Sequence, residues 1–258
     1  MAFGPLDLTG RVAVVIGGTS GIGRALVDGL VQAGADVVAS SRREAEVEVT
    51  AKAIEAAGKR TVRVPCDVAS RPSIQKLHDE VIAAFGKADI LINCAGRTKR
   101  TPTIEVSEEE FTAIMDTNLL GTLRACQVFG RSMIAKKYGR IINIASLSSF
   151  VALHEVAAYA ASKSAVASLT KSLAVEWSKH GVCVNAIAPG VFRTALNQKL
   201  LDETPRGAEF LTRTPMARFG KVEELAGAAV FLSSDAASFV NGEILTVDGG
   251  FLASGVNQ

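Results

Sequence analysis

The feature that most restricts how this chain can fold is a repeated alternation between short apolar segments and longer segments with helical spacing. The segment RVAVVIGG (residues 11–18) is rich in β-branched residues and ends in glycines, which is typical of a buried strand. Apolar residues then recur at helical spacing over residues 25–34. The expected strands are residues 11–18, 35–40, 61–66, 88–93, 139–146, 181–189 and 242–250, and the further expected helices are residues 44–57, 71–85, 107–137 and 157–179.

Strands that are apolar along most of their length are covered on both faces, as in parallel sheets flanked by helices. We therefore expect a doubly wound α/β fold with about seven parallel strands. No linker, low-complexity tract or internal repeat interrupts the alternation, so residues 1–258 are expected to form a single domain. Residues 191–219 carry Thr, Pro, Arg and Gly with weak periodicity, and we expect them to form a mobile substrate lid.

Composition argues against several classes of partner. Apolar residues make up 48% of the chain, and the net charge of +2 comes from scattered charged residues, so we expect neither nucleic acid nor a membrane as a partner. The N-terminal stretch MAFGPLDLTGR lacks the features of a signal peptide. Widely spaced cysteines without a CxxC pair indicate buried thiols in a cytoplasmic protein. No cluster has metal-ligand spacing, so no catalytic metal is expected.

Three glycines lie between the first expected strand and the first expected helix. The sequence GGTSGIG places Gly17, Gly21 and Gly23 in the spacing G-x-x-x-G-x-G, which differs from the G-x-G-x-x-G dinucleotide motif. Glycines allow the backbone to approach a phosphate closely, and the N–H groups at a helix start attract a pyrophosphate. At this position we interpret the glycines as a dinucleotide site of the Rossmann type rather than a purely structural turn.

The end of the second expected strand indicates which dinucleotide is bound. An NAD site usually has an acidic residue there, about 20 residues after the glycines. This chain has Ser41, followed by Arg42 and Arg43. Arginine and serine can bind a 2′-phosphate through charge-assisted and hydroxyl hydrogen bonds. We therefore favour NADP(H) over NAD(H), although two arginines could instead open a solvated helix.

Tyr159 lies four residues before Lys163 in the stretch AAYAASKSA, and the chain has only two tyrosines. On a helix these two positions lie one turn apart on the same face. A free tyrosine has a pKa near ~10, and a nearby ammonium can lower it by roughly 1 to 3 units, toward the range of a general acid/base. The pair therefore predicts that Tyr159 transfers a proton. The alternative is that the Tyr159 ring only fills the core.

These residues belong to a longer set of motifs that resembles the short-chain dehydrogenase/reductase family over essentially the whole chain. The set follows the family's order, and thirteen residues separate Ser146 from Tyr159. The matching motifs are GGTSGIG (17–23), CDV (66–68), NCAG (93–96), TNLLG (117–121), Ser146, YAASK (159–163) and APGVFRT (188–194). One departure is Ile16, where the family usually has a threonine that bonds within the glycine turn.

The resemblance implies a role for each matching residue. Tyr159 would be the general acid/base, and Lys163 would hold the nicotinamide ribose and lower the pKa of the tyrosine. Ser146 would orient the substrate carbonyl, and Asn118 would support a water chain that reaches Lys163. Together with the glycine turn and the arginines, the candidate cofactor-binding residues are Gly17, Thr19, Ser20, Gly21, Ile22, Gly23, Ser41, Arg42, Arg43, Cys66, Asp67, Val68, Asn93, Ala95, Gly96, Tyr159, Lys163, Pro189, Gly190, Phe192 and Thr194.

The substrate is less constrained by the sequence than the cofactor. Ser148 and His154 lie in the loop between Ser146 and Tyr159, and they could contact a polar substrate, or His154 could lie on an exposed loop. Arg193 could bind a carboxylate or a polyol hydroxyl, or form a salt bridge within the lid. The overall pattern is similar to gluconate 5-dehydrogenases and related sugar or polyol dehydrogenases, and also to 3-oxoacyl-carrier-protein reductases. A small carbonyl or alcohol is the expected substrate.

Two further expectations concern assembly and activity. The helices over 107–137 and 157–179 carry apolar residues on more than one face. The family pairs such helices between subunits, and the C-terminal segment 248–258 resembles a second contact, so a homotetramer is expected. A Rossmann domain can also bind a cofactor as a sensor or scaffold without turnover, but that reading predicts a missing catalytic residue, and all four are present.

Overall fold

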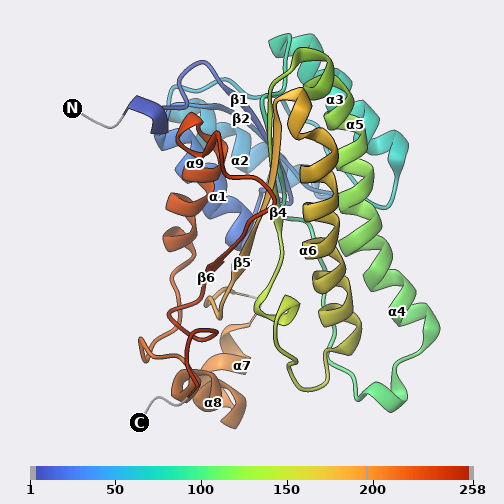
Figure 1. The fold of residues 1–258 in the computed structure, drawn as a ribbon, viewed down its shortest axis with the longest axis vertical. Helices are drawn as coiled ribbons and strands as arrows, with labels where there is room; N and C mark the ends of the chain where they lie inside the picture. The colour runs from blue at the N-terminus through green and yellow to red at the C-terminus, as the bar shows by residue number, and fades with distance from the viewer. Residues whose placement is uncertain (1–3, 196, 256–258) are drawn as a thin grey trace.

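The computed structural model describes residues 4–195 and 197–255, and it contains one parallel sheet at the centre (Figure 1). Its six strands lie in the order β2-β1-β3-β4-β5-β6. Each strand pairs in parallel with its neighbours. The strands are β1 (Val12–Ile16), β2 (Asp36–Ser40), β3 (Ile90–Asn93), β4 (Gly139–Ile144), β5 (Val182–Pro189) and β6 (Ile244–Val247).

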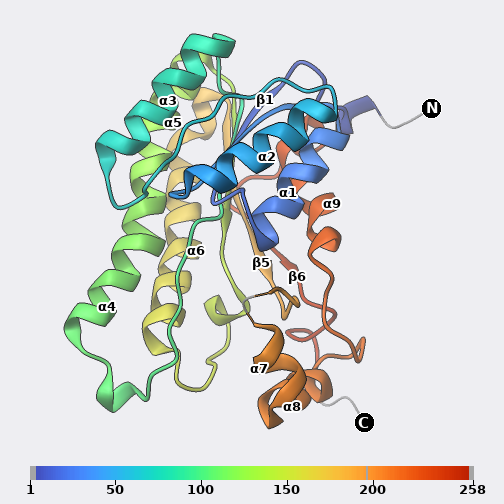
Figure 2. The same ribbon diagram turned by 180° about the vertical axis from the view of Figure 1, so that it is seen from behind.

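Helices cover both faces of this sheet, which confirms the expected doubly wound α/β fold. Figures 1 and 2 show α1, α2 and α9 on one face and α3, α4, α5 and α6 on the other. The α-helices are α1 (Gly21–Gln32), α2 (Glu44–Ala56), α3 (Arg71–Phe85), α4 (Glu108–Met115), α5 (Gly121–Lys136), α6 (Ala157–Trp177), α7 (Gln198–Glu203), α8 (Pro205–Arg213) and α9 (Ala226–Ser233). Within the described ranges, every helix is too short or too polar to span a membrane.

The apolar strands explain why both faces need cover. Every residue of β1, β3, β4 and β5 is buried. Successive side chains point to opposite faces, so alternate residues of one strand enter two different cores. In β1, Val14 packs into the core under α3, α5 and α6, while Val15 packs into the core under α1 and α9.

The expectation of about seven strands is wrong by one strand. Residues 61–66 run beside the outer edge of β2 but do not form a regular ladder with it. The contacts are isolated bonds: Val37 N donates to Arg60 O (3.3 Å), Cys66 N to Ser41 O (3.0 Å), and Ser40 Oγ to Val64 O (2.5 Å). The segment therefore covers the sheet edge as an extended chain, which a sequence rich in valine does not distinguish from a strand.

The single helix expected over 107–137 is interrupted. The structure has α4, then a π-helical turn η3 (Asp116–Leu120), then α5. At the junction, a Cβ on Gly121 would lie 2.9 Å from the Val68 side chain, so the helix passes close to the loop after residue 66. Such π-turns occur mostly within α-helices and often at functional sites.

The expected lid contains two short helices rather than an irregular loop. Figure 1 shows α7 and α8 at the carboxyl edge of the sheet, beyond the end of β5. Residue 196, within the expected lid, lies outside the described residues, as do residues 256–258 of the expected C-terminal subunit contact. Parallel α/β sheets bind their ligands at this edge, where neighbouring strands connect in opposite directions. Here that point lies between β1 and β3.

The opposite edge of the sheet holds a buried carboxylate. The Asp89 side chain is fully buried, and it accepts bonds from Val12 N (3.0 Å) and from the Lys136 ammonium (2.6 Å), with the Lys87 ammonium 3.0 Å away. Burial raises the pKa of Asp89, but the bonds from the two lysines and from Val12 outweigh it, so the pKa lies below its ordinary value. Asp89, directly before β3, thus connects this strand to β1 by a hydrogen bond and to α5 by an ion pair.

Replacing this carboxylate tests its contribution to stability. Because the native pKa is lowered, the stabilisation is complete above the ordinary pKa of ~3.9 and is lost as the pH falls through the lower native value. We expect Asp89→Asn to lower the free energy of unfolding by about 3 kcal/mol at pH 7, measured by urea denaturation. The difference from wild type should shrink below pH ~4. A difference that does not change with pH would contradict the ionic explanation.

Candidate active site

The glycine turn lies directly after β1 and is held by the backbone of β2. The N–H groups of Gly17 and Gly18 both donate to Ser40 O, at 2.7 and 3.2 Å. These bonds fix the turn although Ile16 replaces the family's threonine. Gly17 has φ +85°, and a Cβ there would lie 2.5 Å from Ala95 N. The turn and the loop after β3 therefore touch, and only glycine fits between them.

The first turn of α1 is open to an anion. Ser20 is the N-cap, and in the described part of the chain its side chain makes no capping bond. A Cβ on Gly23 would lie 2.0 Å from Gly17 O, which shows how tightly the turn is closed. Thr19 directly precedes Ser20 in the chain, and Ile22 directly precedes Gly23. Backbone N–H groups at such a helix start, with the helix dipole, bind phosphate.

The end of β2 offers hydroxyl and guanidinium groups beside this turn. Ser41 Oγ is buried, with no hydrogen-bond partner among the described residues. Arg42 and Arg43 are exposed. A buried hydroxyl without a partner is costly and indicates a ligand or water at that position. This orphaned hydroxyl and the glycine cradle both fit the phosphate groups of a dinucleotide.

Residues after residue 65 approach the same edge. The Asp67 carboxylate accepts from Ala69 N (3.0 Å) within its own loop. Cys66 and Val68 are buried, and burial raises the pKa of the Cys66 thiol to about 11. Asn93 is also turned inward, because its Nδ2 donates to Asn143 Oδ1 (2.9 Å). Of the NCAG motif, Ala95 lies against Gly17 and Gly96 lies near Asn118, whereas the Asn93 side chain joins β3 to β4.

Asn118 lies in the π-helical turn η3, and its side chain is fully buried. Its Nδ2 donates to Ser162 Oγ and to Arg97 O, both at 2.9 Å, and its Oδ1 accepts from Arg97 N at 2.8 Å. A Cβ on Gly96 would lie 3.4 Å from Asn118 Oδ1 and 3.6 Å from Lys163 Nζ. The structure therefore brings Asn118 and Lys163 together around Gly96.

Lys163 is almost completely buried, at 6% exposure, and its ammonium donates to Ile144 O at 2.7 Å. This bond joins α6 to the carboxyl end of β4. Burial lowers the pKa of Lys163 to about 8, opposed by the nearby Cys94 thiol. Nζ lies 5.8 Å from the centre of the Tyr159 ring, so the two side chains share one face of α6, as their spacing predicts.

Ser146 completes the group, because its hydroxyl lies near enough to the Tyr159 phenol to lower the pKa of that phenol. The expected lowering of the tyrosine pKa by Lys163 is nevertheless wrong for this structure. Burial raises the pKa of Tyr159 above its ordinary value, the Ser146 hydroxyl opposes that rise, and Cys94 adds to it.

The three expected substrate residues occupy different environments. Ser148 is buried next to Ser146, and its Oγ has no partner in the described ranges. His154 is exposed at the rim, where its carbonyl accepts from Arg206 on α8 at 2.9 Å. Arg193 forms an ion pair with Asp202 on α7, which is the lid salt bridge that the sequence left open.

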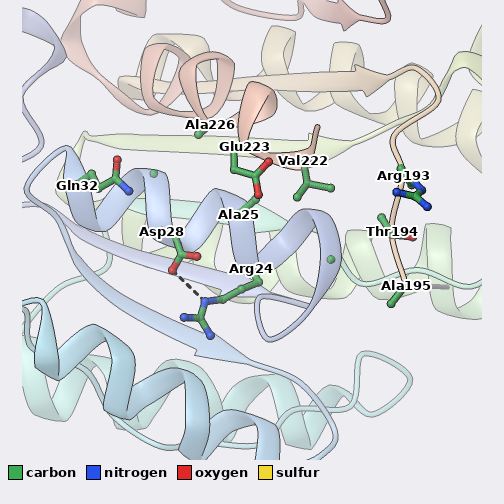
Figure 3. Close-up of a pocket in the computed structure, with 12 residues that line it drawn as sticks. Arg24, Ala25, Asp28, Gln32, Arg193, Thr194, Ala195, Val222, Glu223 and Ala226 are labelled. Atoms are coloured by element: carbon green, nitrogen blue, oxygen red, sulfur yellow. Dashed lines mark hydrogen bonds and ion pairs between the residues drawn. The ribbon is translucent and has the colours of Figure 1, made fainter. Parts of the chain in front are cut away.

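The segment after β5 lies opposite the glycine turn. Gly190 N donates to Val247 O at 2.8 Å, and Phe192 is buried under α9, so Pro189 to Phe192 are firmly seated. A Cβ on Gly21 would lie 3.8 Å from the Thr194 methyl group. A cavity of about 390 Å³ extends from this point along α1, with Arg193 and Thr194 at one end and Gln32 at the other (Figure 3). Tyr159 and Ser146 are not among the residues that line it.

Sequence reasoning missed several residues that position the site. Asn197 caps the segment after β5, with Oδ1 accepting from Thr194 N at 2.7 Å and Nδ2 donating to Phe192 O at 2.8 Å. Ser162, between the two catalytic candidates in YAASK, fixes Asn118. Glu46 bonds to Thr19 at 3.0 Å. A serine or an asparagine at loop and helix positions is too common to have identified any of them. Among the described residues, no three His, Cys, Asp or Glu side chains gather as a metal site would require.

With this geometry in place, the chain can be compared with known proteins. The model of a family described as enoyl-(acyl carrier protein) reductase matches residues 16–252. A protein of Dickeya dadantii named 2-dehydro-3-deoxy-D-gluconate 5-dehydrogenase is 39% identical over 98% of this chain and 100% of its own length. A protein of Gluconobacter oxydans named gluconate 5-dehydrogenase is 39% identical over 96% of this chain and 97% of its own length.

A solved structure is similarly close. The crystal structure of a gluconate 5-dehydrogenase from Burkholderia cenocepacia, in complex with NADP and tartrate, superposes with a TM-score of 0.95. It is 39% identical in sequence and covers 98% of this chain and 100% of its own. The similarity therefore extends over nearly the whole chain.

The tight packing of the glycine turn makes a direct prediction. Gly23→Ala would force a methyl group to 2.0 Å from Gly17 O, so the backbone of the turn must shift. We expect the affinity for NADPH, measured by fluorescence titration, to fall at least about tenfold. Gly227→Ala is the matched control, because a Cβ there meets nothing within 4 Å. Equal affinities of the two variants would contradict the assignment of the turn.

Proposed function

The chain belongs to the short-chain dehydrogenase/reductase family, and from this we propose that it interconverts a ketone and a secondary alcohol of a sugar acid, using NADP(H). The observation that carries the proposal is the group formed by Tyr159, Ser146 and Lys163 at the carboxyl edge of the sheet. A hydroxyl pair beside a buried lysine is suited to binding a carbonyl oxygen and exchanging a proton with it.

The proposed roles follow from the contacts of these side chains. When bound, the nicotinamide supplies or accepts the hydride. Ser146 and Tyr159 would bind the substrate oxygen through their neighbouring hydroxyls, and Tyr159 would transfer the proton. Lys163 would replenish that proton, because its pKa of about 8 lies near the operating pH.

Asn118 and Ser162 are proposed as positioning residues. The bond between them ties the π-helical turn η3 to the segment of α6 that carries both Tyr159 and Lys163. Ser162 Oγ also donates to Tyr159 O at 2.7 Å, within the same helical turn. Asn118 adjoins Lys163 around Gly96, which is compatible with the expected water chain to the ammonium.

A preference for NADP(H) over NAD(H) is supported by the chemistry at the end of β2. Ser41 Oγ is an orphaned donor, and the adjacent Arg42 and Arg43 are exposed cations. No acidic residue occupies position 41, where an NAD site would place one. The relative from Burkholderia cenocepacia was crystallised with NADP.

A sugar acid as the substrate is supported by the names of the relatives and by the polar rim of the site. Arg206 on α8 bonds to His154 O, and the Arg100 guanidinium pairs with Glu155 at 2.5 Å in the same loop. Two guanidinium groups therefore bond to the loop between Ser148 and α6. Charged and hydroxyl side chains of this kind suit a carboxylate with several hydroxyls.

We further propose that α7 and α8 act as a substrate lid. The Arg206 guanidinium on α8 donates to His154 O in the loop before α6, and a contact of this kind can break and re-form as substrate enters. The homotetramer and the cytoplasmic location remain predictions. The four cysteines are free thiols in the described part of the chain, which is compatible with a reducing compartment.

The carrier-protein alternative is less well supported. Docking an acidic carrier would use basic residues such as Arg131, Lys136 and Lys137, but the Lys136 ammonium is held by the buried Asp89 carboxylate. A non-catalytic sensor would have no need for the Ser146 hydroxyl near the Tyr159 phenol or for a buried lysine beside them. The Tyr159→Phe variant distinguishes the sensor from the proposed dehydrogenase, and a panel of substrates distinguishes the carrier-protein reductase from it.

Tyr159→Phe removes only the phenolic hydroxyl. We expect NADPH to bind with nearly unchanged affinity while the turnover number falls about 10²- to 10⁴-fold, since positioned proton transfer contributes that factor. Turnover is followed by NADPH absorbance, and binding by fluorescence. Unchanged turnover would exclude Tyr159 as the acid/base, and absence of turnover in the wild type on every carbonyl tested would favour a sensor.

A panel of carbonyls and alcohols tests the substrate class. We expect NADPH oxidation with 5-keto-D-gluconate, and a value of kcat/KM at least about tenfold higher than with a neutral ketose that lacks the carboxylate, since charge-assisted bonds to a carboxylate are worth that much. The panel also includes polyols and an acetoacetyl thioester. Activity confined to the thioester would replace the sugar-acid proposal by the carrier-protein reductase.

A further inference from the structure

A glutamate lies between Arg43, which is expected to bind the 2′-phosphate, and Thr19 of the glycine turn. Thr19 Oγ1 in the glycine turn donates to Glu46 Oε2 at 3.0 Å. The other carboxylate oxygen of Glu46 is 2.6 Å from Arg43 Nη2. Glu46 thus joins the turn after β1 to the start of α2 and takes a hydroxyl and a guanidinium that a phosphate could use.

The neighbouring residues show where Glu46 and its two partners lie in the fold. Arg43 is the N-cap residue of α2, two residues after the orphaned Ser41 hydroxyl. Thr19 stands between the glycines of the turn that approaches the backbone after β3. Glu46 therefore sits where β1 and β2 end next to each other, and the ribose end of a dinucleotide binds at that point in doubly wound sheets.

We propose that Glu46 is an internal competitor of the 2′-phosphate, which lowers the affinity for NADP(H) and so limits the preference over NAD(H). This inference rests on the proposed use of NADP(H) at the same site. To bind the phosphate with Arg43 and Thr19, the protein must first break two bonds to Glu46. It must then hold a carboxylate near a group of the same charge, which weakens binding.

Of the other acidic side chains of α2, Glu44 is exposed in the first turn of the helix, and Glu48 and Glu55 do not share the position of Glu46. Glu48 is engaged by Arg63 at 2.6 Å and by Lys52 at 3.3 Å, and Glu55 is engaged by Arg63 at 2.7 Å. Both are therefore neutralised by cations outside the cofactor edge. The Arg43 side chain is 68% exposed, so it can leave Glu46 without a change in the fold.

A competing interpretation gives Glu46 the opposite effect. An acidic side chain near the end of the second strand commonly binds the ribose hydroxyls of NAD. Glu46 lies 23 residues after Gly23 and could take that part once released from Arg43. In that case removing its charge would weaken NADH binding and leave no gain for NADPH.

Binding titrations on the full chain separate the two. Dissociation constants for NADPH and NADH are measured by nucleotide fluorescence with the wild type, Glu46→Gln and, as a matched control on the same helix, Glu48→Gln. We expect Glu46→Gln to bind NADPH about tenfold more tightly, with NADH changed less than about twofold, since a single like charge nearby is worth about that factor. Glu48→Gln should match the wild type for both nucleotides.

A second variant tests whether Arg43 is the group that Glu46 withholds. In an Arg43→Gln background, Glu46→Gln should raise the affinity for NADPH clearly less than it does in the wild type. The reason is that the ion pair between Glu46 and Arg43 is already absent in this background. If Glu46→Gln raised the affinity for NADPH equally in both backgrounds, the release of Arg43 would not be the cause of the increase. Thermal melting of each variant, at equal protein concentration, shows that it is folded.

The outcomes also distinguish this inference from the proposed function. If the wild type binds NADPH and Glu46→Gln binds it no better, or loses NADH affinity, the competitor proposal is overturned while the dehydrogenase proposal stands. If the wild type binds neither nucleotide, the proposed function fails and the inference fails with it.

Discussion

The active-site geometry depends on one buried hydrogen bond, from the Lys163 ammonium to Ile144 O at 2.7 Å. It fixes α6 against the carboxyl end of β4, the strand that leads directly to Ser146. Tyr159, one helical turn away, is then held next to that serine. Burying a charge at this point is costly, and the lowered pKa of Lys163 reports that cost. The proton-transfer role proposed for Lys163 depends on this lowered pKa.

Most of the fold could be predicted from the sequence because its information is local and repetitive. The β-branched strands and the glycine turn are visible in RVAVVIGGTSGIG, and the structure confirms both. The prediction of a seventh strand was wrong, since residues 61–66 have strand-like composition but make only isolated bonds to β2. The π-helical turn at Asp116–Leu120 could not be predicted, because it depends on the approach of Gly121 to Val68, far apart in the chain.

In the candidate site too, sequence motifs predicted some features, whereas others depend on contacts between distant residues. Motif order brought Asn118, Ser146, Tyr159 and Lys163 into one group, and the structure places them together. The spacing of Tyr159 and Lys163 also suggested a lowered tyrosine pKa, which the structure contradicts, because spacing carries no information about burial. Partners such as Glu46 and Asn197 come from distant or ordinary-looking segments, and only three-dimensional contacts identify them.

The central claim is that burial moves the Lys163 ammonium into the range where it can serve proton transfer. The most direct measurement is an NMR titration of the wild-type chain with labelled lysine, in which the Lys163 signal is assigned by its loss in Lys163→Met. The account predicts a titration midpoint at about pH 8 for this residue. A midpoint near the ordinary value of ~10.4 would contradict it.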